Sequence, residues 1–252
     1  MPAIIALPAG LILGSFATVV AHRVPRGESI VGGRSRCPSC AAPIAAYDNV
    51  PVLSWFLLRG RCRRCGVRIP ARYPLTELAM AALFVATALI LGTGDPGQLA
   101  LGLALCAVLT IVTLTDLERR VIPNAVLLPG AVIGIAIAAV ADPGSLVERA
   151  VAAAGAGGAL LCVALAYPRG MGMGDVKLAA VMGLYLGRAV APAMLIGFGA
   201  GALFGLCLIA GKGAGARKRA VPFGPFLAFG GVVGLWYGDA MVGWYVNTFF
   251  GG

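Results

Sequence analysis

The sequence predicts an all-α polytopic membrane protein with about eight transmembrane helices and a cytoplasmic zinc-binding tetracysteine loop. Three observations lead to this fold class. The 252 residues are 60% hydrophobic and only 12% charged, whereas a soluble domain carries about 25% charged residues. Apolar runs close to the roughly 20 residues that cross a bilayer recur along the chain. Two Cys-x-x-Cys pairs lie in a polar segment after the first of these runs.

Eight apolar segments are predicted as helices. The first lacks a basic leading region and a small-residue cleavage site, so we expect a retained span and not a removable signal peptide. The segment 175–187 is short for about 30 Å of hydrocarbon, and it is either a tilted crossing or a half-span buried among its neighbours. The predicted segments are 3–22, 74–92, 98–115, 121–141, 150–167, 175–187, 189–211 and 223–246.

The net charge of +10 indicates topology, not a nucleic-acid partner, because the basic residues lie in alternate loops. The loops 23–73, 116–120, 168–177 and 212–222 hold 18 of the 20 Lys and Arg residues, and the remaining two are Arg149 and Arg188. By the positive-inside rule, the side with 18 is cytoplasmic. Both termini then face outward.

Four cysteines in the first loop have the spacing of a structural metal site. Cys37-Pro38-Ser39-Cys40 and Cys62-Arg63-Arg64-Cys65 are separated by 21 residues, which is typical of a tetrahedral four-cysteine zinc site. The alternative is a set of unligated or disulfide-bonded cysteines, which a reducing cytoplasm disfavours. A filled four-cysteine site has no open position, so zinc would fold the loop and perform no chemistry. Cys106, Cys162 and Cys207 are expected to be small buried apolar residues.

Two aspartates lie where apolar spans meet water, and ionisable groups at membrane depth are functional candidates. Asp116 precedes Glu118, Arg119 and Arg120, so it is either functional or an interfacial acid paired with an arginine. Asp175 follows Gly172 and Gly174 and opens a helix, where a carboxylate is favoured by the helix dipole. It could therefore be a simple helix cap. Both acids fall on the predicted cytoplasmic face.

At this point the chain resembles the prepilin peptidases (type IV leader peptidases), which are related in mechanism to the Gly-x-Gly-Asp membrane aspartic proteases. The order of the matching motifs carries the resemblance. Ala17-Thr18 departs from it, since the family commonly has a bulkier residue and Asn there. The motifs are Gly14-Ser15-Phe16, His22-Arg23-Val24-Pro25, Arg34 to Cys40, Asp48 to Trp55, Gly60 to Cys65, Arg72 to Glu77, Asp116, Ile122-Pro123-Asn124, Gly172 to Leu178, and Pro222 to Phe226.

The resemblance implies a membrane aspartic endopeptidase whose catalytic pair is Asp116 and Asp175. Its substrates would be type IV prepilins or pseudopilins, and it would cut their basic leader after a glycine on the cytoplasmic face of the bacterial inner membrane. Many members then methylate the new amino terminus with S-adenosylmethionine, for which no binding residue can be transferred. Because the leader is basic, Glu118, Glu77 and Asp48 are better candidates to contact it than the arginines of the loop.

The resemblance also suggests three parts of the chain. Residues 1–92 would form the first span, the zinc loop (23–73) and the second span. Residues 98–211 would form the peptidase core, and residues 212–252 the basic loop and last span. Membrane lipids are the expected surroundings, and the sequence leaves the oligomeric state open.

Two functions of other classes also fit parts of the sequence. A proton- or cation-coupled transporter could use Asp116 and Asp175, although transport sites tend towards the bilayer midplane. A non-catalytic assembly factor could use the zinc loop for docking. That reading leaves the Gly-x-Gly-Asp turn without a role.

Overall fold

The structure is a computed structural model that describes residues 2–30, 35–92, 94–168, 170–212 and 221–250. Regular structure within these ranges is helical, apart from two isolated β-bridges in the cysteine loop. The prediction of an all-α membrane protein is therefore confirmed. The chain divides into two compact units, Met1–Thr93 (unit 1) and Gly94–Gly252 (unit 2). The basic residues Arg34, Arg169, Arg217, Lys218 and Arg219 lie outside the described ranges.

Unit 1 consists of two long helices that pack together and the loop between them. Helix α1 (Pro2–Arg23) lies against α3 (Arg72–Leu91). A Cβ atom on Gly10 would lie 2.6 Å from the Ala81 Cα, and one on Gly14 would lie 2.7 Å from the Glu77 Cα. Two glycines four residues apart thus let the backbones meet, as small residues do in membrane helix pairs. The loop holds η1 (Val24–Arg26), η2 (Ala46–Asn49) and α2 (Leu53–Leu57).

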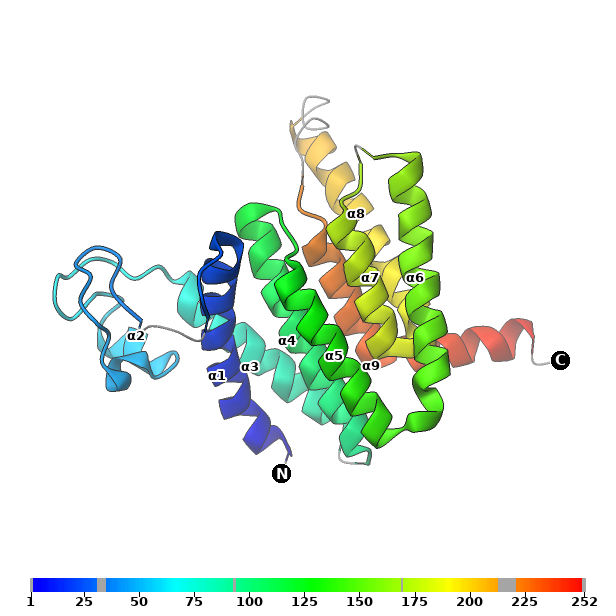
Figure 1. Cartoon of the computed structure of the whole chain (residues 1–252), viewed down its shortest axis with the longest axis horizontal. Helices are drawn as coiled ribbons and strands as arrows, with labels where there is room; N and C mark the ends of the chain where they lie inside the picture. Colours follow the sequence, from blue (N-terminus) through cyan, green and yellow to red (C-terminus); the bar gives the residue numbers. More distant parts are fainter. Residues whose placement is uncertain (1, 31–34, 93, 169, 213–220, 251–252) are drawn as a thin grey trace. The chain divides into compact units, whose positions relative to one another are not determined.

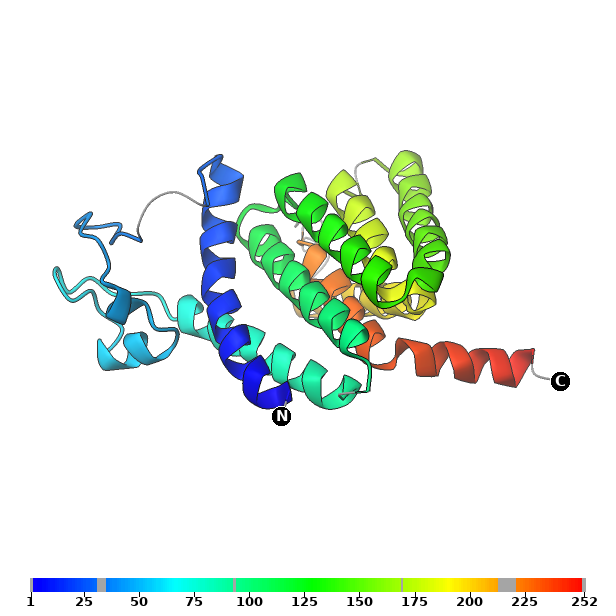
Figure 2. The same ribbon diagram turned by 60° about the horizontal axis from the view of Figure 1, so that its bottom comes forward.

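Unit 2 is a bundle of antiparallel helices (Figures 1 and 2). Within it, α4 packs on α5 and α9, α6 on α7, and α8 on α9. Consecutive helices run in opposite directions, so one end of the bundle gathers the ends of α4, α6 and α8 and the starts of α5, α7 and α9 (Figure 1). The helices are α4 (Pro96–Arg119), α5 (Asn124–Ala141), α6 (Leu146–Ala166), α7 (Met173–Leu186), α8 (Val190–Lys212) and α9 (Gly224–Phe249), with the short helices η3 (Pro143–Ser145) and η4 (Gly187–Ala189).

Glycine and alanine bring the helices of unit 2 close together. A Cβ on Gly183 would lie 2.6 Å from the Ala153 Cα, so α7 and α6 meet backbone to backbone. On α9, a Cβ on Gly234 would lie 2.5 Å from the Ala193 Cβ, and one on Gly238 would lie 2.6 Å from the Ala189 Cβ. Small residues have this packing role in membrane helix pairs.

Seven stretches of the described residues are long and apolar enough to cross a membrane. One of them, Met173–Gly211, contains both α7 and α8, and the chain reverses between them at η4 (Figure 1). Helix α7 has only 14 residues and is therefore about 21 Å long. The number of full crossings, predicted as about eight, stays a prediction.

One expectation about the cysteines within the helices is wrong in part. Cys106 is buried, but Cys162 and Cys207 are exposed on their helices. A helix face that points to lipid accepts a small apolar side chain as readily as the protein core does. Composition alone therefore does not distinguish a buried cysteine from a lipid-facing one.

Candidate active site and metal centre

Asp116 lies one turn before the end of α4 and is only 6% exposed. Its neighbour Thr115 is fully buried. The helix ends just beyond, because Arg120 adopts a left-handed conformation (φ 54°) and donates its N–H to the Asp116 carbonyl at 2.8 Å. The carboxylate itself accepts a hydrogen bond from the Gly224 N–H at 2.8 Å, at the start of α9. The charge of Arg120 also acts on this carboxylate.

Asp175 occupies the first turn of α7 and is half-buried. Gly172 is the N-cap of the helix, and its carbonyl accepts the Asp175 N–H at 3.1 Å. A Cβ on Gly174 would lie 2.9 Å from the Ile122 Cβ, so this glycine lets α7 begin directly against the α4–α5 connection. At Gly174, the Gly-x-Gly-Asp turn thus allows the start of α7 to pack closely against the α4–α5 connection.

The two acids come from separate helices and lie at the same end of unit 2. Helices α4 and α7 are in contact, and Asp116 and Asp175 are close enough for the charge of one to act on the other. At the same end, Lys177 donates to the Asn124 Oδ1 at 3.0 Å and ties α7 to the start of α5. Both acids lie near helix ends and not at mid-helix, which does not favour a transport site at the bilayer midplane.

Sequence reasoning assigned no role to Gly224 or to the Lys177–Asn124 pair. Each belongs to a motif that the resemblance includes, so the signal was present as a motif without a function. The hydrogen bonds join residues 108 and 53 positions apart. Pairings at that distance have no local sequence pattern.

The four cysteines of the loop meet at one point. Their sulfur atoms all lie within 4.8 Å of one another, and the Cys37 and Cys65 sulfurs are 3.7 Å apart. A tetrahedral zinc ion with Zn–S bonds of about 2.3 Å would hold its sulfurs about 3.8 Å apart, whereas a disulfide needs about 2.05 Å. All four are free of disulfides. The donor set and its spacing fit a structural zinc ion.

The two Cys-x-x-Cys segments fold into matching turns. The Ala41 N–H donates to the Cys37 carbonyl, and the Gly66 N–H donates to the Cys62 carbonyl, both at 2.9 Å. The backbone N–H groups of Cys40 and Ser39 lower the pKa of the Cys37 thiol to about 6. A lowered pKa favours the thiolate, which is the form that binds a metal.

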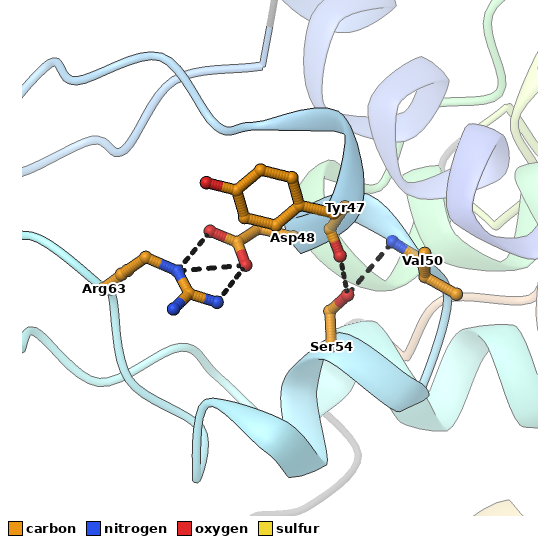
Figure 3. A network of polar contacts seen from close by, with 5 residues as sticks. All are labelled: Tyr47, Asp48, Val50, Ser54 and Arg63. Atoms are coloured by element: carbon orange, nitrogen blue, oxygen red, sulfur yellow. Dashed lines mark hydrogen bonds and ion pairs between the residues drawn. The ribbon is translucent and has the colours of Figure 1, made fainter.

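Polar contacts hold the rest of the loop (Figure 3). Arg63 makes a bidentate ion pair with Asp48 at 2.7–3.2 Å, and this pairing lowers the pKa of Asp48. The Ser54 hydroxyl donates to the Tyr47 carbonyl at 3.0 Å and accepts the Val50 N–H at 3.1 Å (Figure 3).

Glu77 is buried near the start of α3 and accepts the Val52 N–H at 2.7 Å. This hydrogen bond joins the loop to α3. The loop and the helix ends form a partly open cavity of about 460 Å³, whose lining includes His22, Tyr47, Asp48, Trp55, Arg63 and Glu77. Two of the three acids considered for leader binding, Asp48 and Glu77, are thus engaged within unit 1. Glu118 is exposed two residues after Asp116.

Comparisons with known proteins match two family domains to the chain. The bacterial peptidase A24 N-terminal domain matches residues 9–91, and the type IV leader peptidase family matches residues 103–209. Several relatives bear the name prepilin leader peptidase/N-methyltransferase. The protein of Aeromonas hydrophila is 36% identical over 95% of this chain and 92% of its own length. That of Bacillus subtilis (strain 168) is 34% identical over 96% and 97%.

No solved structure matches the chain, so the family rests on sequence. The two domain matches follow one another along the chain, and the first ends close to the boundary between units 1 and 2. The second contains both Asp116 and Asp175. With relatives above 30% identity over nine tenths of its length, the chain belongs to the type IV leader peptidase family.

Proposed function

We propose that this protein is a membrane aspartic endopeptidase that removes the basic leader of type IV prepilins or pseudopilins. Asp116 and Asp175 are the catalytic pair. The observation that carries the proposal is that two acids, one buried and one half-buried, lie at the same end of unit 2 on two helices in contact. Family membership supplies the substrate class, since the relatives are named prepilin leader peptidases.

The chemistry follows from two neighbouring carboxyl groups that share one proton. Like charges at short distance do not both ionise in a poorly solvated site. The ionised member takes a proton from water, which attacks the scissile carbonyl. The protonated member polarises the carbonyl oxygen. Cleavage takes place at a helix end, where an extended peptide can enter, because a helical substrate hides its scissile bond.

The location of the pair suits a substrate that is itself embedded in the membrane. A prepilin keeps its apolar helix in lipid and its charged leader in the cytosol, so the cleavage glycine lies near the interface. The distribution of Lys and Arg, 18 on one side and two on the other, supports a cytoplasmic position for this end of the bundle.

We also propose that the protein methylates the new amino terminus, as the names of its relatives suggest. S-adenosylmethionine would supply the methyl group. The cavity of about 460 Å³ in unit 1 has the room for such a ligand, and Tyr47 and Trp55 are among its lining residues. Zinc in the four-cysteine site would hold the loop that forms this cavity.

The catalytic assignment is tested with Asp116→Asn and Asp175→Asn, purified in detergent and incubated with a prepilin. Each variant should lose cleavage by at least about 10²-fold, the usual contribution of a general acid or base, while remaining inserted in the membrane. Asp142→Asn is the control, because Asp142 is exposed at the opposite end of unit 2. Substantial processing by either catalytic-site variant would refute the assignment. Mass spectrometry of the product reports the cut and any added methyl group.

A further inference from the structure

The first residue of α9 touches a proposed catalytic acid through its backbone. Gly224 begins the helix, and its N–H donates to the Asp116 Oδ2 at 2.8 Å in a buried position. The two residues are 108 positions apart in the chain. The contact therefore joins the end of α4 to the start of α9 at the site itself.

The N–H groups at the start of α9 show why this donor is available. The first N–H groups of a helix have no carbonyl partner within the helix. Pro225 has no N–H, and the Phe226 and Leu227 N–H groups both donate to the Phe223 carbonyl, at 3.0 and 3.2 Å. The Gly224 N–H is the donor left over, and the Asp116 carboxylate satisfies it. The positive end of the helix dipole also favours a negative charge there.

Glycine fits at this position without displacing the Asp116 side chain. A Cβ on residue 224 would lie 2.8 Å from the Asp116 Oδ2 and 3.2 Å from both the Cβ and the Cγ of Asp116. The glycine is therefore required by the close approach of the acid, not by an unusual backbone conformation. A larger residue would push the Asp116 side chain out of place.

We propose that Gly224 is a positioning residue for Asp116, and that its N–H holds the carboxylate in the orientation that catalysis requires. This inference rests on the proposed function. A backbone N–H only donates, and its bond to the Asp116 Oδ2 is strongest when that oxygen is unprotonated. The contact therefore favours the proton of the pair on the Asp116 Oδ1 or on Asp175, and it limits rotation of the Asp116 side chain.

The first test compares Gly224→Ala with Gly231→Ala on the same helix. A Cβ on Gly231 would meet the Leu109 Cδ1 at 2.9 Å and the Met182 Cε at 3.1 Å, both at the ends of flexible side chains and neither in the site. We expect Gly224→Ala to lower kcat for prepilin cleavage by about 10²-fold, as a misplacement near 1 Å does, with KM unchanged. Gly231→Ala should keep both parameters near those of the wild type. Equal losses of kcat in the two variants would overturn the inference.

The second test removes the N–H without adding an atom to the side chain. Replacement of Gly224 by glycolic acid turns its amide into an ester, and the same replacement of Gly231 is the matched control, since an ester also weakens the preceding carbonyl. We expect a fall in kcat of at least tenfold at position 224 alone, with KM near that of the wild type in both variants, although the Gly231 ester also removes a hydrogen bond within the helix. A wild-type kcat for the Gly224 ester overturns the inference, even if Gly224→Ala fails to fold.

The two failures are distinguishable. If Asp116→Asn cleaves normally, the proposed function falls and this inference falls with it. If Asp116→Asn is inactive while the Gly224 ester has wild-type kcat, the catalytic pair stands. In that case the positioning role alone is wrong.

Discussion

Ala41 and Gly66 occupy equivalent places in the two cysteine turns, and both have a positive φ, of 55° and 69°. This backbone region is strained for a residue with a Cβ, by about 1–2 kcal/mol, and free for glycine. A Cβ on Gly66 would meet nothing within 4 Å, so its substitution by alanine would change backbone strain alone. Ala41→Gly would therefore relieve backbone strain in this loop, and Gly66→Ala would introduce it.

We predict that Ala41→Gly tightens zinc binding and that Gly66→Ala weakens it. A four-cysteine loop gains its fold from the metal, so the folding free energy appears as metal affinity. A change of about 1 kcal/mol alters the zinc dissociation constant about fivefold. Competition with a chromophoric chelator measures both variants. An unchanged affinity in Gly66→Ala would show that the turn does not need this conformation when zinc is bound.

At the residue scale, the sequence indicates side-chain chemistry well and backbone chemistry poorly. The cysteines were identified from their spacing, because each pair lies within one turn and only cysteine supplies the thiolates. The Gly224 N–H has no residue signature, since nearly every residue carries one. Its partner Asp116 lies on another helix, so only the packing of α4 against α9 reveals the contact.

At the element scale, a side chain of α6 makes hydrogen bonds to the C-terminal end of the short helix α7. Arg149, in the first turn of α6, donates to the Leu184 and Tyr185 carbonyls at 3.1 and 2.6 Å. These are among the last carbonyls of α7, which have no partner within the helix. The neighbouring Glu148 accepts the Arg188 N–H at 3.0 Å. The start of α6 thus completes the hydrogen bonding of the α7–α8 turn.

We predict that Arg149→Met destabilises unit 2 by about 1.5–3 kcal/mol, the range for hydrogen bonds to a charged group. Thermal unfolding in detergent measures the change. Arg188→Met is the control: Arg188 pairs with Asp239 at 3.0 Å, but both side chains are about 60% exposed, and exposed pairs contribute about 0–1 kcal/mol. Equal midpoints for the two variants would contradict a capping role for Arg149.

The elements themselves were largely predictable, because a membrane span is a local property of about 20 apolar residues. The predicted segment 98–115 corresponds to α4, and 189–211 corresponds to α8. The pairing of helices was not predictable in the same way. It depends on which face carries the small residues, and glycines such as Gly183 and Gly155 look alike in sequence. The first meets the backbone of α6, whereas a Cβ on the second would meet nothing within 4 Å.

At the scale of the whole molecule, the two ends of unit 2 differ in the charged residues that they hold. The end that holds Asp116 and Asp175 also holds Arg119, Arg120 and Lys177. The opposite end holds Arg149 and Arg188. The alternation read from the sequence therefore corresponds to two real ends of the bundle, and its assignment to membrane sides stays a prediction.

This arrangement leads to a prediction about how a basic leader is drawn to a site surrounded by cations. Asp48 and Glu77 lie in unit 1, where they contact Arg63 and Val52. Glu118 is exposed at the end of unit 2 where Asp116 lies. Glu118→Lys should lower kcat/KM for a basic leader by about 30-fold at low salt, because an attraction of about 1 kcal/mol between charges near 4 Å in water becomes a repulsion of the same size. The loss should shrink as salt shortens the Debye length.

A leader whose basic residues are replaced by neutral ones distinguishes a loss of electrostatic attraction from damage to the catalytic site. Glu118→Lys should cleave that leader at the wild-type rate, because no charge is left to repel. Asp142→Lys makes the same change of charge at the opposite end of unit 2 and should leave both leaders unaffected. If Glu118→Lys slows the two leaders equally, the lysine has disturbed Asp116 and the leader is recognised elsewhere. If neither leader is slowed, the acid plays no part in recognition, and the basic leader must be selected by shape at the helix ends.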